Sequence, residues 1–83
     1  MDYKEKLEAL YALAREYRLA SNQNDFAKLL KTDPSTLSHS LRGDEKYLRT
    51  IETLVHRGVS LLHDRSVPLP EWSRVVVAPR VEQ

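Results

Sequence analysis

Residues 22–43 read NQNDFAKLLKTDPSTLSHSLRG, and this stretch decides the fold that the sequence predicts. Asn22 is a favourable N-cap for a short helix over residues 23–30, because its side-chain oxygen can accept a hydrogen bond from a free N–H of the first turn. Asp33 followed by Pro34 marks a second helix start, since proline at the first helical position loses no hydrogen bond. The stretch therefore predicts two short helices in close succession.

The second of these helices covers residues 34–42, and Gly43 follows it as the residue that most easily adopts the left-handed conformation at a helix end. Lys31 and Thr32 remain to form a tight turn between the two helices. So short a connection is typical of a helix-turn-helix, in which the second helix is presented outward and can enter the major groove of DNA.

Apolar residues recur at helical spacing on both sides of this stretch. We expect one helix over residues 3–19 and another over residues 46–57, which Gly58 ends. Ser60 is then the cap of a short fifth helix over residues 60–65. The sequence therefore predicts a compact, all-α domain of five helices.

Residues 66–83 form a C-terminal tail beyond this helical domain, which we place at residues 1–65. Three consecutive valines over residues 75–77 are β-branched and favour a short β-strand. Because a lone strand is not stable, the tail pairs across the two-fold axis of a dimer, folds back on its own domain with Trp72 in the core, or stays disordered. The sequence leaves these three arrangements open.

The length and composition narrow the class of protein. A chain of 83 residues is expected to form one domain, and the absence of cysteine excludes disulfides and thiolate metal sites. No apolar run is long enough to span a bilayer, and the N-terminal segment lacks the apolar core of an export signal. We therefore expect a cytoplasmic protein without a membrane segment.

The net charge is only +1, but cations outnumber acids over residues 28–49. A local positive surface can bind phosphate even when the whole chain is nearly neutral. The alternative is that these lysines and arginines are ordinary solvated side chains.

Residues 10–64 resemble the Cro and phage-repressor helix-turn-helix family, which is also called the XRE type. The positions that carry the resemblance are Gln23, Ala27, Leu37, Ser38, Gly43 and the string LRTIETLVHRGVSLL over residues 48–62. The resemblance implies a lambda-repressor-like domain that binds double-stranded DNA, usually as a homodimer, and regulates transcription, with repression as the expected effect. Such regulators are typical of phages and other mobile elements.

Two positions depart from the pattern of that family. Lys31 occupies a turn position often held by glycine, so either a non-glycine residue adopts an unusual backbone angle there or the turn is shaped differently. Ser40 occupies a position that is usually apolar, and its hydroxyl is expected to bond back to the preceding turn of the helix.

The resemblance also implies which side chains would contact DNA. By position, the base-contacting residues are Ser35, Thr36, Ser38 and His39, and the phosphate-contacting residues are Gln23, Lys31, Arg42, Lys46 and Arg49. Serine and threonine hydroxyls can bond to several bases, and histidine can reach a purine N7. The alternative is a polar helix that simply faces solvent.

No other chemistry is indicated by the sequence. His56 and His63 lack acidic or thiol partners at ligand spacing, so we expect no metal site and no cofactor. No catalytic constellation is evident, so we expect no enzyme. The competing hypothesis is a protein-interaction module, antitoxin-like or a phage-control protein, that uses the same fold and its C-terminal tail to bind a protein partner.

Overall fold

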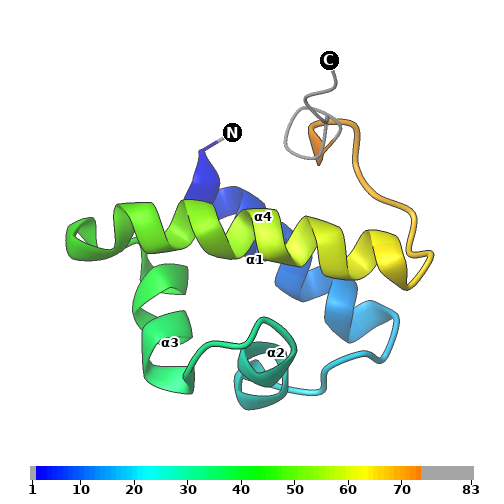
Figure 1. The fold of residues 1–83 in the computed structure, drawn as a ribbon, viewed down its shortest axis with the longest axis horizontal. Helices are drawn as coiled ribbons and strands as arrows, with labels where there is room; N and C mark the ends of the chain where they lie inside the picture. The colour runs from blue at the N-terminus through cyan, green and yellow to red at the C-terminus, as the bar shows by residue number, and fades with distance from the viewer. Residues whose placement is uncertain (1, 74–83) are drawn as a thin grey trace.

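Two long helices pack against each other and support two short helices, as Figure 1 shows. The computed structural model describes residues 2–73, and within this range the elements of regular structure are four α-helices and one short 3-10 helix. The elements in chain order are α1 (Tyr3–Glu16), α2 (Gln23–Leu29), α3 (Pro34–Arg42), the 3-10 helix η1 (Glu45–Tyr47) and α4 (Leu48–Asp64). The predicted all-α class is therefore confirmed for the described residues.

Helix α1 begins at a capping box that fixes its first turn. The Asp2 carboxylate accepts a hydrogen bond from the Glu5 N–H at 2.9 Å, and the Glu5 carboxylate accepts one from the Asp2 N–H at 3.2 Å. The helix ends at Glu16 rather than at residue 19, because Arg18 adopts a left-handed conformation with φ of 61° and reverses the chain. Its buried stripe then faces α4.

Helix α4 runs without a break from Leu48 to Asp64. The prediction that Gly58 ends this helix, and that Ser60 caps a fifth helix, is therefore wrong. Gly58 lies buried inside α4 where α1 crosses it, and a Cβ atom at this position would lie only 2.9 Å from Cδ1 of Leu10. The glycine is explained by the close approach of two helices, whereas the sequence interpretation treated it as a helix stop.

The core lies between these helices and contains the apolar residues that the helical spacing singled out. The largest fully buried side chains are Phe26, Leu7, Leu10, Leu30, Leu37, Ile51, Leu54, Leu62, Val55, Val59 and Ser40. Phe26 anchors α2, and its ring centroid lies 5.2 Å from that of Tyr11 on α1. Burial of this apolar surface, at roughly 25 cal/mol per Å², is the main term that holds a domain of this size together.

The segment after α4 folds back on the helical domain. Val67 is buried, and the half-buried Trp72 packs against the core. The Lys6 ammonium lies 5.6 Å from the centroid of the Trp72 ring and 4.7 Å from that of Tyr3. The described part of the tail therefore packs on its own domain, and the predicted strand over residues 75–77, on which the predicted pairing across a dimer depends, lies outside the described residues.

Candidate nucleic-acid interface

The start of α2 is fixed by two side chains of its first turn. The Asn22 side chain accepts a hydrogen bond from the Asp25 N–H at 2.9 Å, so the predicted N-cap is confirmed. The Asp25 carboxylate in turn accepts hydrogen bonds from the hydroxyl and the N–H of Ser21, at 2.5 and 3.1 Å. These bonds, the hydroxyl first, lower the pKa of the Asp25 carboxyl from its ordinary value of 3.8.

The turn between α2 and α3 contains the unusual backbone angle, which is the first of the two alternatives that the sequence leaves open. Lys31 has a φ of 59°, in the left-handed region. Arg57 of α4 reaches this turn, and its Nη1 donates to the carbonyl oxygens of Leu30 at 3.1 Å and of Lys31 at 3.4 Å. A guanidinium at the C-terminal end of α2 also complements the helix dipole. Sequence reasoning missed Arg57, because no local pattern links it to so distant a carbonyl.

Helix α3 is closed at both ends by its own neighbours. The Asp33 carboxylate accepts hydrogen bonds from the N–H and the hydroxyl of Thr36, and Gly43 ends the helix with a φ of 77°. The N–H groups of Gly43 and Asp44 donate to the carbonyls of Ser40 and His39, at 3.0 and 3.3 Å. This pair of bonds is a Schellman motif, which satisfies the last carbonyls of the helix.

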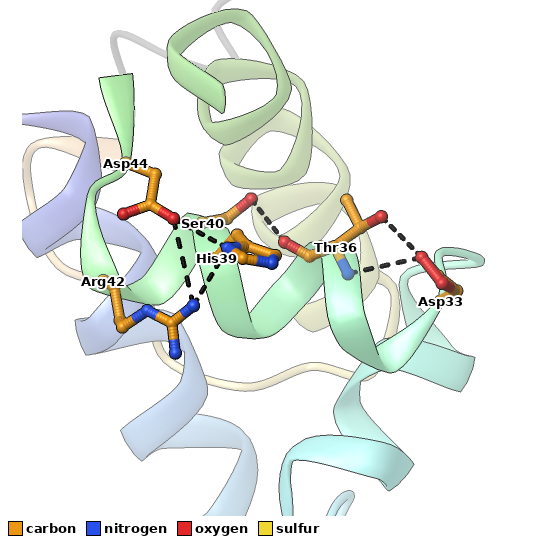
Figure 2. Close-up of polar contacts among 6 residues, drawn as sticks. All are labelled: Asp33, Thr36, His39, Ser40, Arg42 and Asp44. Atoms are coloured by element: carbon orange, nitrogen blue, oxygen red, sulfur yellow. Dashed lines mark hydrogen bonds and ion pairs between the residues drawn. The ribbon is translucent and has the colours of Figure 1, made fainter. Parts of the chain in front are cut away.

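One face of α3 packs inward and the other carries polar side chains. Leu37 and Ser40 are fully buried, and the Ser40 hydroxyl donates to the Thr36 carbonyl at 2.8 Å, as the sequence predicts (Figure 2). Ser35 is exposed, whereas Ser38 is half-buried. Helix α3 is therefore anchored through its buried face, and its other face carries the small hydroxyl side chains of Ser35 and Ser38.

The four predicted base-contacting residues all lie on α3, but they differ in burial and in the hydrogen bonds that their side chains already make. Thr36 is half-buried and its hydroxyl already donates to Asp33, which leaves its methyl group and its oxygen lone pairs for a further contact. His39 is half-buried as well, and three neighbours hold its ring. Ser35 and Ser38 make no side-chain hydrogen bond to any described residue.

The neighbours of His39 form a polar cluster at the C-terminal end of α3, which Figure 2 shows apart from Tyr47. Nδ1 of His39 lies 2.7 Å from Oδ2 of Asp44 and 2.9 Å from Nη2 of Arg42. The Tyr47 ring stacks on the imidazole with centroids 4.9 Å apart and planes tilted by 6°. Sequence reasoning missed Asp44 and Tyr47, although a histidine and an aspartate at the two ends of a Schellman motif are a usable signal.

The predicted phosphate-contacting residues lie at two places. Arg42, Lys46 and Arg49 are exposed at the end of α3, in η1 and in the first turn of α4, so the structure brings them to one end of the molecule. Gln23 and Lys31 are exposed at the two ends of α2. All five side chains are accessible to a ligand, and their phosphate contacts stay a prediction.

Comparisons of the chain with protein-family models, with curated proteins and with solved structures give no match. Among residues 2–73, no helix has the length and apolar character needed to cross a membrane. Within the same residues, no group of histidine and acidic side chains is arranged to hold a metal ion. The function is therefore inferred from the geometry of α3 and its surroundings.

Proposed function

We propose that this protein is a sequence-specific DNA-binding transcriptional regulator that places α3 in the major groove, with α2, the Lys31 turn and α3 as its helix-turn-helix. The observation that carries the proposal is the division of α3 into two faces. Leu37 and Ser40 anchor the helix to the rest of the domain, and the opposite face presents Ser35, Ser38 and His39. A helix of about 10–12 Å diameter fits a major groove about 12 Å wide.

The surrounding charges support the same orientation. Arg42, Lys46 and Arg49 lie beside the C-terminal end of α3, where a duplex that holds the helix would bring its phosphate backbone. Lys31 adds a separate exposed cation in the turn that precedes α3. Each cation that neutralises a phosphate releases condensed counterions, so the affinity gained in this way falls as salt rises.

We propose a homodimer as the DNA-binding species and repression by occupation of an operator as its effect. A dimer with two-fold symmetry would recognise an inverted repeat whose half-sites are centred about one helical turn of DNA, roughly 34–36 Å, apart. Selection of bound duplexes from a random DNA pool at roughly 150 mM salt tests the proposal, because nonspecific phosphate binding is suppressed there. Enrichment of an inverted repeat is expected, and binding without enrichment of any sequence would contradict the proposal.

A set of single alanine variants tests the orientation on the DNA. Arg42→Ala, Lys46→Ala and Arg49→Ala should each weaken binding to all sequences and reduce the slope of log affinity against log salt by about one unit. Arg65→Ala is the matched control, because it removes the same charge from the far end of α4. Equal slopes for all four variants would refute the proposed orientation.

One observation favours the second candidate, a protein-interaction module. Leu48 is 61% exposed, and with Tyr3 and Ile51 it lines a groove at the start of α4. Leu48 gives this groove an exposed apolar side chain that a protein partner would bury on binding. Failure of the selection experiment would direct attention to this groove and to a protein partner.

A further inference from the structure

The protonation of His39 follows from its contact with Asp44. A carboxylate oxygen accepts hydrogen bonds and donates none, so a separation of 2.7 Å between Oδ2 of Asp44 and Nδ1 of His39 requires a proton on Nδ1. With Nδ1 protonated, Nη2 of Arg42 cannot donate to that nitrogen, although it lies only 2.9 Å away. Arg42 is held there by the charge of Asp44 instead, with 3.9 Å between Nη2 and Oδ2.

The rest of the cluster fixes the direction of the imidazole ring. The Schellman bond from the Asp44 N–H to the His39 carbonyl, at 3.3 Å, holds the carboxylate beside Nδ1. The Tyr47 ring, stacked at 4.9 Å, sets the plane of the imidazole. In a neutral ring with its proton on Nδ1, Nε2 carries a lone pair and no proton. No described residue forms a hydrogen bond with Nε2 of the half-buried His39, so in the neutral ring this nitrogen is an acceptor without a partner among the described residues.

We propose that His39 is a specificity-determining residue that accepts a hydrogen bond from the exocyclic amine of adenine or cytosine, with Asp44 and Tyr47 as its positioning residues. The proposal rests on the proposed function, since it requires α3 to lie in a major groove. Adenine N6 and cytosine N4 are the donors displayed there, whereas guanine O6 and N7 and thymine O4 are acceptors. The proposal therefore replaces the expected contact of His39 with a purine N7, which would need a proton on Nε2. Nε2 of His39 opposite guanine O6 or N7, or opposite thymine O4, would place two acceptors together with no proton to share. Guanine and thymine are therefore disfavoured at this position.

The expected preference is modest and confined to one base position. A single hydrogen bond of this kind corresponds to about fivefold in affinity between amino and keto bases. Ser35 and Ser38 add no bias of the same type, because a hydroxyl donates or accepts as needed. The Thr36 hydroxyl proton is already donated to Asp33, so Thr36 can only accept and would favour the same bases. The loss of the preference in His39→Phe is therefore what assigns it to His39.

Nitrogen-15 NMR of the imidazole rings in the full chain tests the first half of the proposal without DNA. At about pH 8, the His39 signals should show a protonated Nδ1 and a bare Nε2, and His39→Phe identifies them by their loss. A ring with its proton on Nε2, or with both nitrogens protonated, would overturn the proposal. This result does not depend on whether the protein binds DNA.

Selection from a random pool with three variants tests the second half. His39→Phe keeps a ring to stack on Tyr47 and should lose the adenine-or-cytosine preference at one position. Asp44→Asn should relax the same position, because an asparagine amide can accept from or donate to Nδ1 and so stabilises both tautomers. Glu45→Gln is the matched control, since it removes one negative charge at the neighbouring residue and should leave the preference unchanged.

The outcomes separate this proposal from the proposed function. A selected motif that His39→Phe and Asp44→Asn leave unchanged would overturn the role of His39 and leave DNA-binding regulation standing. The absence of any selected motif for the wild-type protein would overturn the proposed function and, with it, the role of His39. Loss of the preference in both variants, with retention in Glu45→Gln, is the expected result.

Discussion

Replacement of Gly58 by alanine tests whether this glycine serves helix packing or helix termination. The two effects of the substitution oppose each other. In the interior of a helix, alanine is more favourable than glycine by about 1 kcal/mol. If Gly58 lay in an unhindered helix, Gly58→Ala would therefore stabilise the protein.

The packing around Gly58 reverses this expectation. The new Cβ would lie 2.9 Å from Cδ1 of Leu10, whereas ordinary van der Waals contact begins at 3.4 Å. Leu10 is completely buried, and the added Cβ would also lie 3.7 Å from Cδ2 of Leu30, so the core offers little room for Leu10 to move aside. Overpacking of this kind costs about 1–3 kcal/mol. We expect a net loss of about 1 kcal/mol, which corresponds to a Tm lower by about 4–8 °C.

Urea denaturation of the full chain, followed by circular dichroism, measures this difference. In a Leu10→Val background the clashing Cδ1 is absent, and there Gly58→Ala should become stabilising by up to about 1 kcal/mol. Ser60→Ala is a second check, because an exposed position inside a continuous helix gains a few tenths of a kcal/mol, whereas a lost N-cap costs about 1 kcal/mol. Stabilisation by Gly58→Ala in the wild-type background would refute the packing explanation.

Two further predictions concern the local structure around α2. Lys31→Gly should stabilise the fold by about 0.5–1 kcal/mol, because glycine adopts a φ of 59° without strain. The same variant should reduce the slope of log affinity for DNA against log salt by about one unit, because it removes a cation. Lys31→Ala should reduce this slope equally but should not stabilise the fold. Ser21→Ala removes the hydroxyl that lowers the pKa of Asp25, so the variant should be less stable at neutral pH. The folded state releases the Asp25 proton more readily than the unfolded state. The difference in unfolding free energy between the wild-type protein and Ser21→Ala should therefore shrink as pH falls through 3.8 and below. A difference that does not depend on pH would contradict this assignment.

Much of the candidate site was predictable from short-range chemistry. The caps at Asn22 and Asp33 and the left-handed Gly43 are satisfied by atoms within a turn or two of the same chain segment, so the local sequence is sufficient to predict them. The back-bonded hydroxyl of Ser40 belongs to the same class. The contact of His39 with Asp44 also arises from a local motif, and sequence reasoning could have found it.

The roles of Gly58 and Arg57 depend on contacts between helices that are far apart in the sequence, so only the tertiary structure decided them. Gly58 has the same sequence context whether it ends a helix or lies inside one, and only the approach of Leu10 from α1 explains why no side chain is present there. Arg57 bonds to the α2 turn only because α4 packs beside that turn, 26 and 27 residues away in the sequence. Local hydrogen bonds fix where a helix can begin or end, but the packing of side chains from distant segments determines whether it does so.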